Sequence, residues 1–299
     1  MDSTTLAELR PEPMLSFELP HGMTIAADAY GNASDPAVLF MHGGGQTRHA
    51  WGGTAGALSQ IGFYAICMDM RGHGDSSWAP DGRYRVDDYV EDLLGVVEQL
   101  GRAPILVGAS LGGIAGLLAA ARSGSSVARG LVLVDVTPRT RRDGIERIIG
   151  FMKAGAEGFA SLEEAAEAIA SYLPQRKRRS DLTGLAKNLR QDERGRFQWH
   201  WDPKILEVWD PSRYDQQTRT QIVEDRLVAA KQLTVPTLLI RGRMSDVVSE
   251  EAAQEFLGLA PHAEYVDLAG AAHMVAGDRN DAFTEAVTSF IKKHFENLE

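Results

Sequence analysis

The sequence predicts an α/β fold with a mostly parallel β-sheet flanked by helices. Short apolar runs recur along the 299 residues, and amphipathic helical patterns separate them. Each run is bounded by Gly, Pro or Asp, which are residues that end strands. Strands that alternate with helices form crossover units, and these place the strands side by side and parallel.

Eight strands are expected in all. Residues 14–30 read as a hairpin that adds two antiparallel edge strands. Six further strands are predicted, at residues 37–41, 63–68, 105–107, 130–134, 236–240 and 263–268. Among the helices between them, residues 90–100 place apolar side chains on one face and end at Gly101, a residue typical of helix ends.

About a hundred residues separate the strand at 130–134 from the strand at 236–240, which is too long for one crossover. We therefore expect a core of residues 1–136 and 234–299, with residues 137–233 forming an inserted helical lid, or cap. Residues 161–164 read as a capping box that opens a helix, and the leucines at 182, 185 and 189 suggest another. Residues 137–233 are called the insertion below.

Composition excludes several classes of partner. Lys and Arg number 31 against 41 Asp and Glu, so the net charge of −10 argues against nucleic acid and against an anionic membrane surface. Residues 103–121 carry no charge, but Pro104 and four glycines there oppose a membrane helix. The acidic amino terminus and the single Cys67 lead us to expect a cytoplasmic protein without disulfides.

One serine interrupts an apolar run at the junction of a strand and a helix. Gly108-Ala-Ser110-Leu-Gly112 has the Gly-x-Ser-x-Gly spacing, which allows a sharp turn that lifts a hydroxyl above the strand ends. A serine hydroxyl needs an imidazole to take its proton and a carboxylate to orient that imidazole. The motif alone is weak, because a buried strand followed by a glycine-rich turn has the same composition.

Partners for this serine follow later strands. Asp246 and His273 come after the strands at 236–240 and 263–268, which gives the chain order Ser, Asp, His. Asp135 also ends a strand, at 130–134, and is the alternative acid. His200 is a weaker candidate for the base, because it belongs to the insertion and does not follow a core strand.

A glycine run after the strand at 37–41 predicts an oxyanion site. Backbone N–H groups can converge on an oxygen only where side chains do not intrude, so we expect the amides of Gly44 and Leu111 to serve as donors. A phosphate loop is the alternative, but no Gly-Lys-Ser/Thr follows. Substrate-binding candidates are Gly43, Trp51, Trp199 and Trp201; the last two alternate and so would share a face in an extended chain.

Five segments carry a family resemblance: MHGGG at 41–45, DMRGHGDS at 69–76, VGASLGG at 107–113, RGRMSD at 241–246 and AGAAHMV at 269–275. Through these segments, residues from about 15 to 298 resemble the lidded serine hydrolases of the α/β-hydrolase fold family. Similar proteins include haloperoxidase-like esterases, epoxide hydrolases and carbon–carbon bond hydrolases. The resemblance implies a mostly parallel eight-stranded sheet, structural roles for His42 and His73, and Asp246 as the acid, in the loop most members use.

Because Ser110 replaces the carboxylate nucleophile of epoxide hydrolases, an acyl-enzyme is expected. The predicted function is hydrolysis of a small carboxylic ester or lactone, with water as the only other reactant and with no cofactor or metal. Cofactor-free perhydrolysis of the haloperoxidase-like kind and carbon–carbon bond hydrolysis are the enzymatic alternatives. A ligand receptor or pseudoenzyme on the same fold is the alternative from another class.

Overall fold

The central sheet of the computed structural model has eight strands, as predicted. Residues 11–172, 182–278 and 280–295 are described. In spatial order the strands are β1 (Leu15–Glu18), β2 (Thr24–Tyr30), β4 (Tyr64–Met68), β3 (Ala37–Met41), β5 (Ile105–Ala109), β6 (Gly130–Val134), β9 (Thr237–Gly242) and β10 (Glu264–Leu268). Only the pairings of β2 with β1 and β4 are antiparallel, which confirms the predicted hairpin and the mostly parallel sheet.

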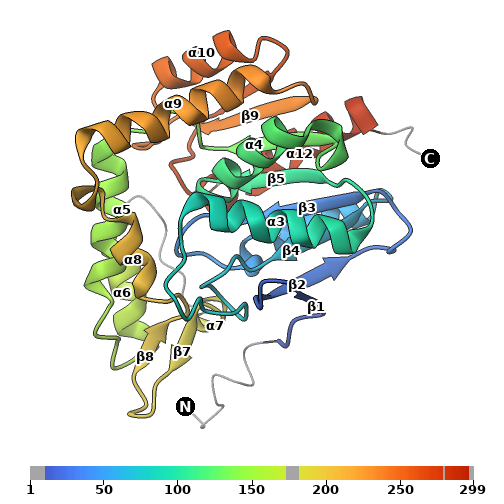
Figure 1. The fold of residues 1–299 in the computed structure, drawn as a ribbon. Coiled ribbons are helices and arrows are strands. Elements are labelled where there is room, and N and C mark those ends of the chain that lie inside the picture. Colours follow the sequence, from blue (N-terminus) through green and yellow to red (C-terminus); the bar gives the residue numbers. More distant parts are fainter. Residues whose placement is uncertain (1–10, 173–181, 279, 296–299) are drawn as a thin grey trace.

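Helices cover both faces of this sheet (Figure 1). One apolar layer contains residues of α3 (Val86–Leu100), α4 (Leu111–Ser123), α9 (Gln216–Gln232) and α10 (Glu250–Leu259). The other contains residues of α2 (Gly52–Ser59) and α12 (Asn280–Phe295). Successive strand residues such as Leu39 and Phe40 enter opposite layers, which explains why these strands are apolar throughout.

The insertion contains more than helices. Between β6 and β9 lie α5 (Arg142–Ala154), α6 (Leu162–Tyr172), α7 (Thr183–Ala186), the antiparallel pair β7 (Leu189–Gln191) and β8 (Phe197–Trp199), α8 (Lys204–Trp209) and α9. Leu189 is therefore in a strand and not in the helix predicted from leucine spacing. The helix with the capping-box sequence does begin at Leu162, with the Glu164 N–H donating to Ser161 Oγ.

Most of the insertion lies along one side of the sheet (Figure 1). Its last helix, α9, packs against the core helices α4 and α10. Its first helix, α5, contacts the loop after β9, where a Cβ at Gly144 would lie 2.4 Å from the Asp246 carbonyl oxygen. The boundaries at 137 and 233 stay a prediction. The uncharged run at 103–121 is divided between β5 and α4, and no helix in the described ranges is both long and apolar enough to cross a bilayer.

Candidate active site

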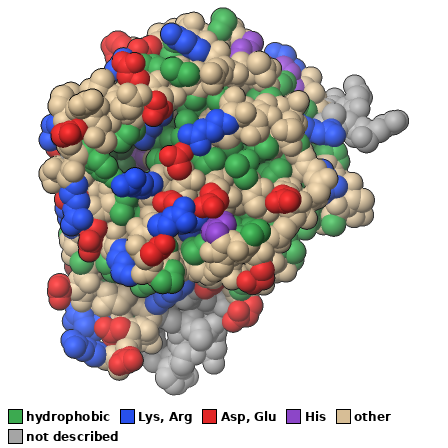
Figure 2. Space-filling model, in the orientation of Figure 1, with side chains coloured by type: hydrophobic (Ala, Val, Ile, Leu, Met, Phe, Trp, Pro, Cys, Tyr) green, Lys and Arg blue, Asp and Glu red, His purple; other side chains and the backbone are tan. Residues whose placement is uncertain are grey.

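The predicted chemical groups gather at the carboxyl edge of the sheet. Gly44, Ser110 and Asp135 follow β3, β5 and β6, which are adjacent strands, and His273 follows β10. In open parallel sheets this edge is where ligands and catalytic loops meet. Figure 2 shows hydrophobic side chains interspersed with charged ones on the face that is turned toward the viewer in Figure 1.

Ser110 occupies a strained turn between β5 and α4. Its φ of 46° and ψ of −110° lie outside the regions that side-chain-bearing residues usually adopt. A Cβ at Gly108 would lie 2.5 Å from the backbone carbon of Gly112, and a Cβ at Gly112 would lie 2.5 Å from the carbonyl oxygen of Met41. The two glycines therefore permit the turn that holds the serine in this conformation.

Backbone strain marks a second residue nearby. Within the described part of the chain, Ser110 and Asp135 are the non-glycine residues with positive φ, and Asp135 has a φ of 48°. Such conformations cost about 1–3 kcal/mol each and persist at functional sites where surrounding contacts enforce them. The two strained residues end neighbouring strands.

Asp135, and not Asp246, holds the histidine. Asp135 Oδ2 accepts a hydrogen bond from His273 Nδ1 at 2.7 Å, and the carboxylate is fully buried. The same oxygen accepts from Ser245 Oγ at 2.6 Å, while Oδ1 accepts from the Gly242 N–H at 2.9 Å. Three donors thus compensate the buried charge of Asp135. Because Nδ1 of His273 is bound to Asp135, the other ring nitrogen, Nε2, points away from the carboxylate.

Asp246, the acid expected from the sequence, pairs elsewhere. Its Oδ2 lies 3.0 Å from Arg147 Nη1 on α5, and both side chains are substantially exposed. The preceding residue explains this, because Ser245 Oγ accepts from the Val247 and Val248 N–H groups and turns the loop so that the serine faces Asp135. The structure therefore brings Asp135, and not Asp246, into contact with His273.

No hydrogen bond between described residues joins the Ser110 hydroxyl to His273. In many enzymes without substrate, the hydrogen bond between nucleophile and base is long or absent and shortens in the reacting complex. The His273 side chain is 13% exposed, so it is available at the surface of the site rather than enclosed in the core.

Two backbone amides beside Ser110 have no acceptor among the described residues. In the glycine loop, the Gly43 N–H donates to Gln46 Oε1 at 2.9 Å and the Gly45 N–H donates to His73 Nε2 at 3.2 Å. For Gly44 and for Leu111, the first residue of α4, no such bond occurs within the described ranges. These are the two amides predicted as oxyanion donors, and a helix amino terminus adds a favourable field for an anion.

Two buried histidines support the glycine loop. His42 Nε2 accepts from the Met70 N–H, and His73 Nε2 accepts from the Gly45 N–H, so both rings carry their proton on Nδ1. Each Nδ1 donates to a backbone carbonyl. Burial lowers the pKa of His42 to about 4 and that of His73 to about 3. Neutral rings fixed in this way act as structural supports.

His200 belongs to the same group of contacts. Its Nδ1 accepts from the Gly74 N–H at 2.8 Å, and its ring lies 6.0 Å from that of His73. This places the insertion against residues 69–76. His200 therefore joins the insertion to the core.

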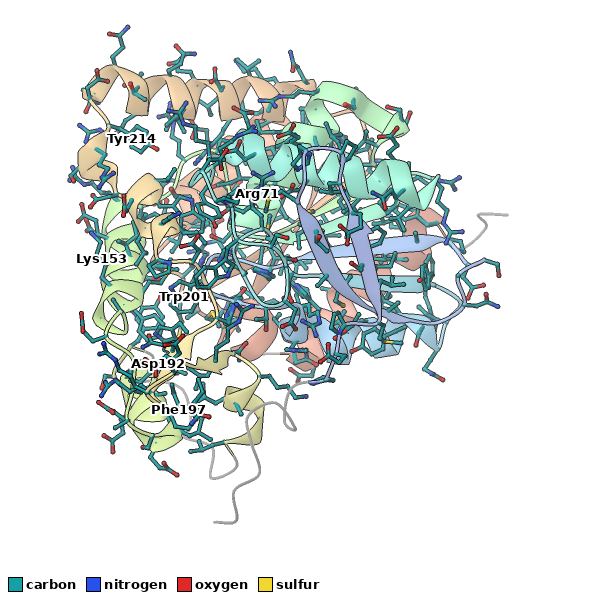
Figure 3. All side chains as sticks on the ribbon, turned by 60° about the horizontal axis from the view of Figure 1, so that its bottom comes forward. Arg71, Lys153, Asp192, Phe197, Trp201 and Tyr214 are labelled. Atoms are coloured by element: carbon teal, nitrogen blue, oxygen red, sulfur yellow. The ribbon has the colours of Figure 1, made fainter. Side chains whose placement is uncertain are left out.

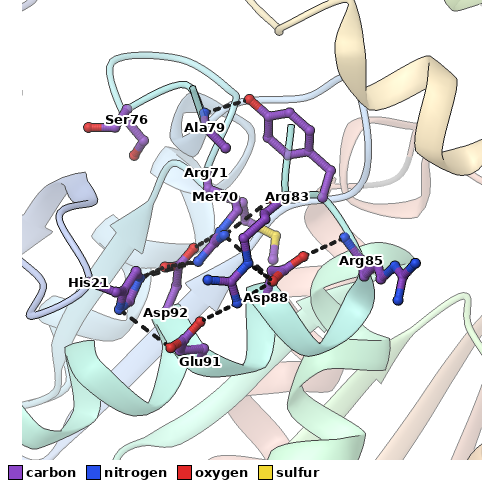
Figure 4. Close-up of polar contacts among 12 residues, drawn as sticks. His21, Met70, Arg71, Ser76, Ala79, Arg83, Arg85, Asp88, Glu91 and Asp92 are labelled. Carbon is purple, nitrogen blue, oxygen red and sulfur yellow. Dashed lines mark hydrogen bonds and ion pairs between the residues drawn. The ribbon is translucent and has the colours of Figure 1, made fainter. Parts of the chain in front are cut away.

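A buried ion pair fixes residues 69–76 on α3. Arg71 donates from Nε and Nη2 to the two oxygens of Asp92, at 2.6 and 2.7 Å, and His21 lies beside them (Figure 4). Both side chains of the pair are almost fully buried. Bidentate pairs of this kind define geometry well, which suits a loop that supports the glycine loop through His73.

The predicted substrate-binding aromatics divide into three cases. Trp51 is 1% exposed and packs between Phe40 and Phe283 in the layer of α2 and α12, so it is a core residue and not a wall of the site. Trp199 and Trp201 do share a face, with ring centroids 4.9 Å apart. Trp199 contacts aromatic residues of the insertion. Trp201, which is labelled in Figure 3, approaches the glycine loop, because a Cβ at Gly45 would lie 3.4 Å from its Cζ3.

Sequence reasoning missed Trp209, the last residue of α8. A Cβ at Gly44 would lie 2.5 Å from its Cζ3, so the indole edge packs directly on the oxyanion loop. Its position at the end of a short helix in the insertion gave no periodic signal that could have singled it out. Gly43, also predicted, lies against Ser110: a Cβ there would be 3.3 Å from the Ser110 Cβ.

Comparison with known proteins agrees with this geometry. The family described as alpha/beta hydrolase fold matches residues 36–279. Esterase Rv0045c of Mycobacterium tuberculosis is 29% identical over 92% of this chain and 89% of its own, and 2-(acetamidomethylene)succinate hydrolase of Mesorhizobium japonicum is 30% identical over 86% and 88%. A crystal structure of E-2-(acetamidomethylene)succinate hydrolase has a TM-score of 0.79 with 26% identity, over 93% of this chain and 98% of that one. The chain thus belongs to the α/β-hydrolase fold family and is a hydrolase.

Proposed function

We propose that the chain is a serine hydrolase that cleaves a small carboxylic ester or lactone through an acyl-enzyme. The observation that carries this proposal is the buried Asp135–His273 pair at the sheet edge that also presents the strained Ser110. The two amides beside Ser110 that lack acceptors within the described ranges support it. So does the name of the mycobacterial relative, which is an esterase.

In the proposed reaction, Ser110 Oγ attacks the carbonyl carbon while His273 Nε2 takes the hydroxyl proton. Asp135 keeps the Nδ1 proton in place and stabilises the imidazolium that forms. The Gly44 and Leu111 N–H groups donate to the oxyanion. When the tetrahedral intermediate collapses, His273 gives its proton to the leaving alcohol, and water then releases the acid by the same steps.

The test is turnover of p-nitrophenyl acetate by purified protein and by the Ser110→Ala and His273→Ala variants. Both variants should lose about three orders of magnitude or more in kcat while keeping the circular dichroism spectrum of the parent. A fluorophosphonate should label the parent and not Ser110→Ala. Near-parental turnover in either variant contradicts the proposal.

The same preparation separates the alternatives predicted from the sequence. Labelling of Ser110 without turnover of any ester or lactone indicates a receptor or pseudoenzyme. Peroxide- and acetate-dependent halide oxidation indicates perhydrolysis. Cleavage confined to vinylogous diketones indicates carbon–carbon bond hydrolysis.

A further inference from the structure

Trp209 brings the insertion into contact with the proposed oxyanion site. Its indole Nε1 donates to the Tyr84 carbonyl oxygen at 3.1 Å, and its ring lies nearly parallel to that of His73, with centroids 6.2 Å apart. Two of its ring carbons, Cζ3 and Cη2, would be 2.5 and 2.8 Å from a Cβ at Gly44. This hydrogen bond and the ring contacts with His73 and Tyr89 thus fix the indole on the Gly44 backbone.

The strand order places this ring opposite the histidine. Trp209 contacts residues that follow β4 and β3, whereas Asp135 and His273 follow β6 and β10 on the far side of β5. The leaving alcohol must lie toward His273, because it takes its proton there. The acyl substituent of the same carbonyl carbon must then extend toward β3 and β4, where the indole stands.

On the basis of the proposed function, we propose that Trp209 limits the length of the acyl group. An acyl carbonyl whose oxygen accepts from the Gly44 N–H lies within about 3 Å of that nitrogen. The indole edge against Gly44 therefore meets the carbons that continue the acyl chain. The substrate class is esters or lactones with a short acyl segment beside the carbonyl.

The first experiment compares two series of esters. One series varies the acyl chain from acetate to octanoate on p-nitrophenol, and the other varies the alcohol on acetate. Trp209→Ala should raise the octanoate-to-acetate ratio of kcat/KM by about tenfold or more, because each accommodated methylene contributes substantially to discrimination. Trp209→Phe, which keeps a ring, should shift the ratio by less than about threefold.

Trp78, 40% exposed, supplies the matched control. Trp78→Ala should leave kcat/KM unchanged across both series, and in every Trp209 variant the ratios of kcat/KM between different alcohols should stay parental. An unchanged acyl ratio in Trp209→Ala and Trp209→Leu overturns the inference. So does a shift confined to the alcohol series.

A second experiment uses Gly44. Its φ lies outside the left-handed region, so alanine is allowed by the backbone and is opposed mainly by the indole. Gly44→Ala should reduce kcat/KM on p-nitrophenyl acetate by about a hundredfold, within the range for loss of one oxyanion donor. Adding Trp209→Ala should restore at least about tenfold of that loss. Full activity of Gly44→Ala, or no restoration in the double variant, contradicts the contact on which the inference rests.

These outcomes are distinct from failure of the proposed function. If the parent hydrolyses no ester and the fluorophosphonate does not label Ser110, both proposals fall. If the parent hydrolyses esters through Ser110 but Trp209 variants keep the parental acyl ratio, only the acyl-length inference fails.

Discussion

Replacing Asp135 by asparagine should remove most of the activity and leave the fold in place. In one orientation the new amide NH₂ would face Ser245 and His273, and in the other it would face the Gly242 N–H, which is itself a donor. Facing His273, the NH₂ can only donate to Nδ1. The imidazole proton would then move to Nε2, and His273 could no longer accept the proton of Ser110.

The magnitude follows from this change of tautomer. In serine proteases with the same arrangement of groups, the equivalent Asp→Asn change lowers kcat about 10⁴-fold. We expect a loss of about 10³–10⁴ here, which corresponds to about 4–5.5 kcal/mol of transition-state stabilisation. The mismatched buried amide should also lower the free energy of unfolding by about 1–3 kcal/mol.

The assay is kcat/KM on p-nitrophenyl acetate, with Asp246→Asn as the matched control and urea unfolding to confirm a folded state. Asp246 forms an exposed ion pair with Arg147, and such pairs contribute about 0.2–1 kcal/mol. Asp246→Asn should therefore stay within about threefold of the parent. A thousandfold loss in Asp246→Asn with near-parental activity in Asp135→Asn would refute the assignment of the acid.

Three further predictions concern supports of the site. Burial depresses the pKa of His42 to about 4 and that of His73 to about 3, so below about pH 6.5 the unfolded chain binds more protons than the folded one. The free energy of unfolding should therefore fall as the pH is lowered from about 6.5 to 4. A urea midpoint that does not change with pH over this range would contradict the prediction. Gly112→Ala should destabilise the protein by about 3 kcal/mol or more, because the new Cβ would lie 2.5 Å from the Met41 carbonyl oxygen. Gly56→Ala is the control: Gly56 lies in helix α2 with open space around it, so alanine there should stabilise the protein by up to about 1 kcal/mol. Equal thermal midpoints for the two variants would contradict the close approach of Gly112 to the Met41 backbone. Ser245→Ala removes the hydroxyl that donates to Asp135, and it should lower kcat about tenfold with KM little changed. A parental kcat would show that this donor is dispensable.

The fold was predictable because several patterns agreed. Apolar strands, punctuating glycines and helical periodicity all indicated the same α/β architecture, and each parallel strand begins within one residue of its predicted start. The insertion was less predictable, because its short strands carry little periodic pattern. The alternation of Trp199, the last residue of β8, with Trp201 indicates a shared aromatic face but does not by itself indicate a strand. Tertiary packing, which the sequence pattern does not contain, decided its small sheet.

Within the site, the serine, the histidine and the glycine loop could be singled out because their local turns require particular residues. The carboxylate that pairs with His273 could not, because Asp135 and Asp246 both follow apolar strands, and spacing does not show which one is buried. One signal was present: Asp135 lies inside the continuous apolar run at 130–136, and a carboxylate in such a run must have compensating donors. Asp246 is preceded by Ser245, whose hydroxyl supplies one of those donors.

The segment that follows Asp135 also joins the insertion to the core. The chain leaves the sheet at this residue and enters the insertion within a few positions, and the Arg141 N–H donates to the Val247 carbonyl oxygen. A hinge at residues 135–141 would pull the carboxylate away from His273 and break this backbone contact. The contacts with the loop after β9 continue beyond Arg141, because a Cβ at Gly144 would lie 2.4 Å from the Asp246 carbonyl oxygen and Arg147 pairs with the Asp246 carboxylate. The segment that follows Asp135 is therefore tied to the same loop whose Ser245 donates to Asp135.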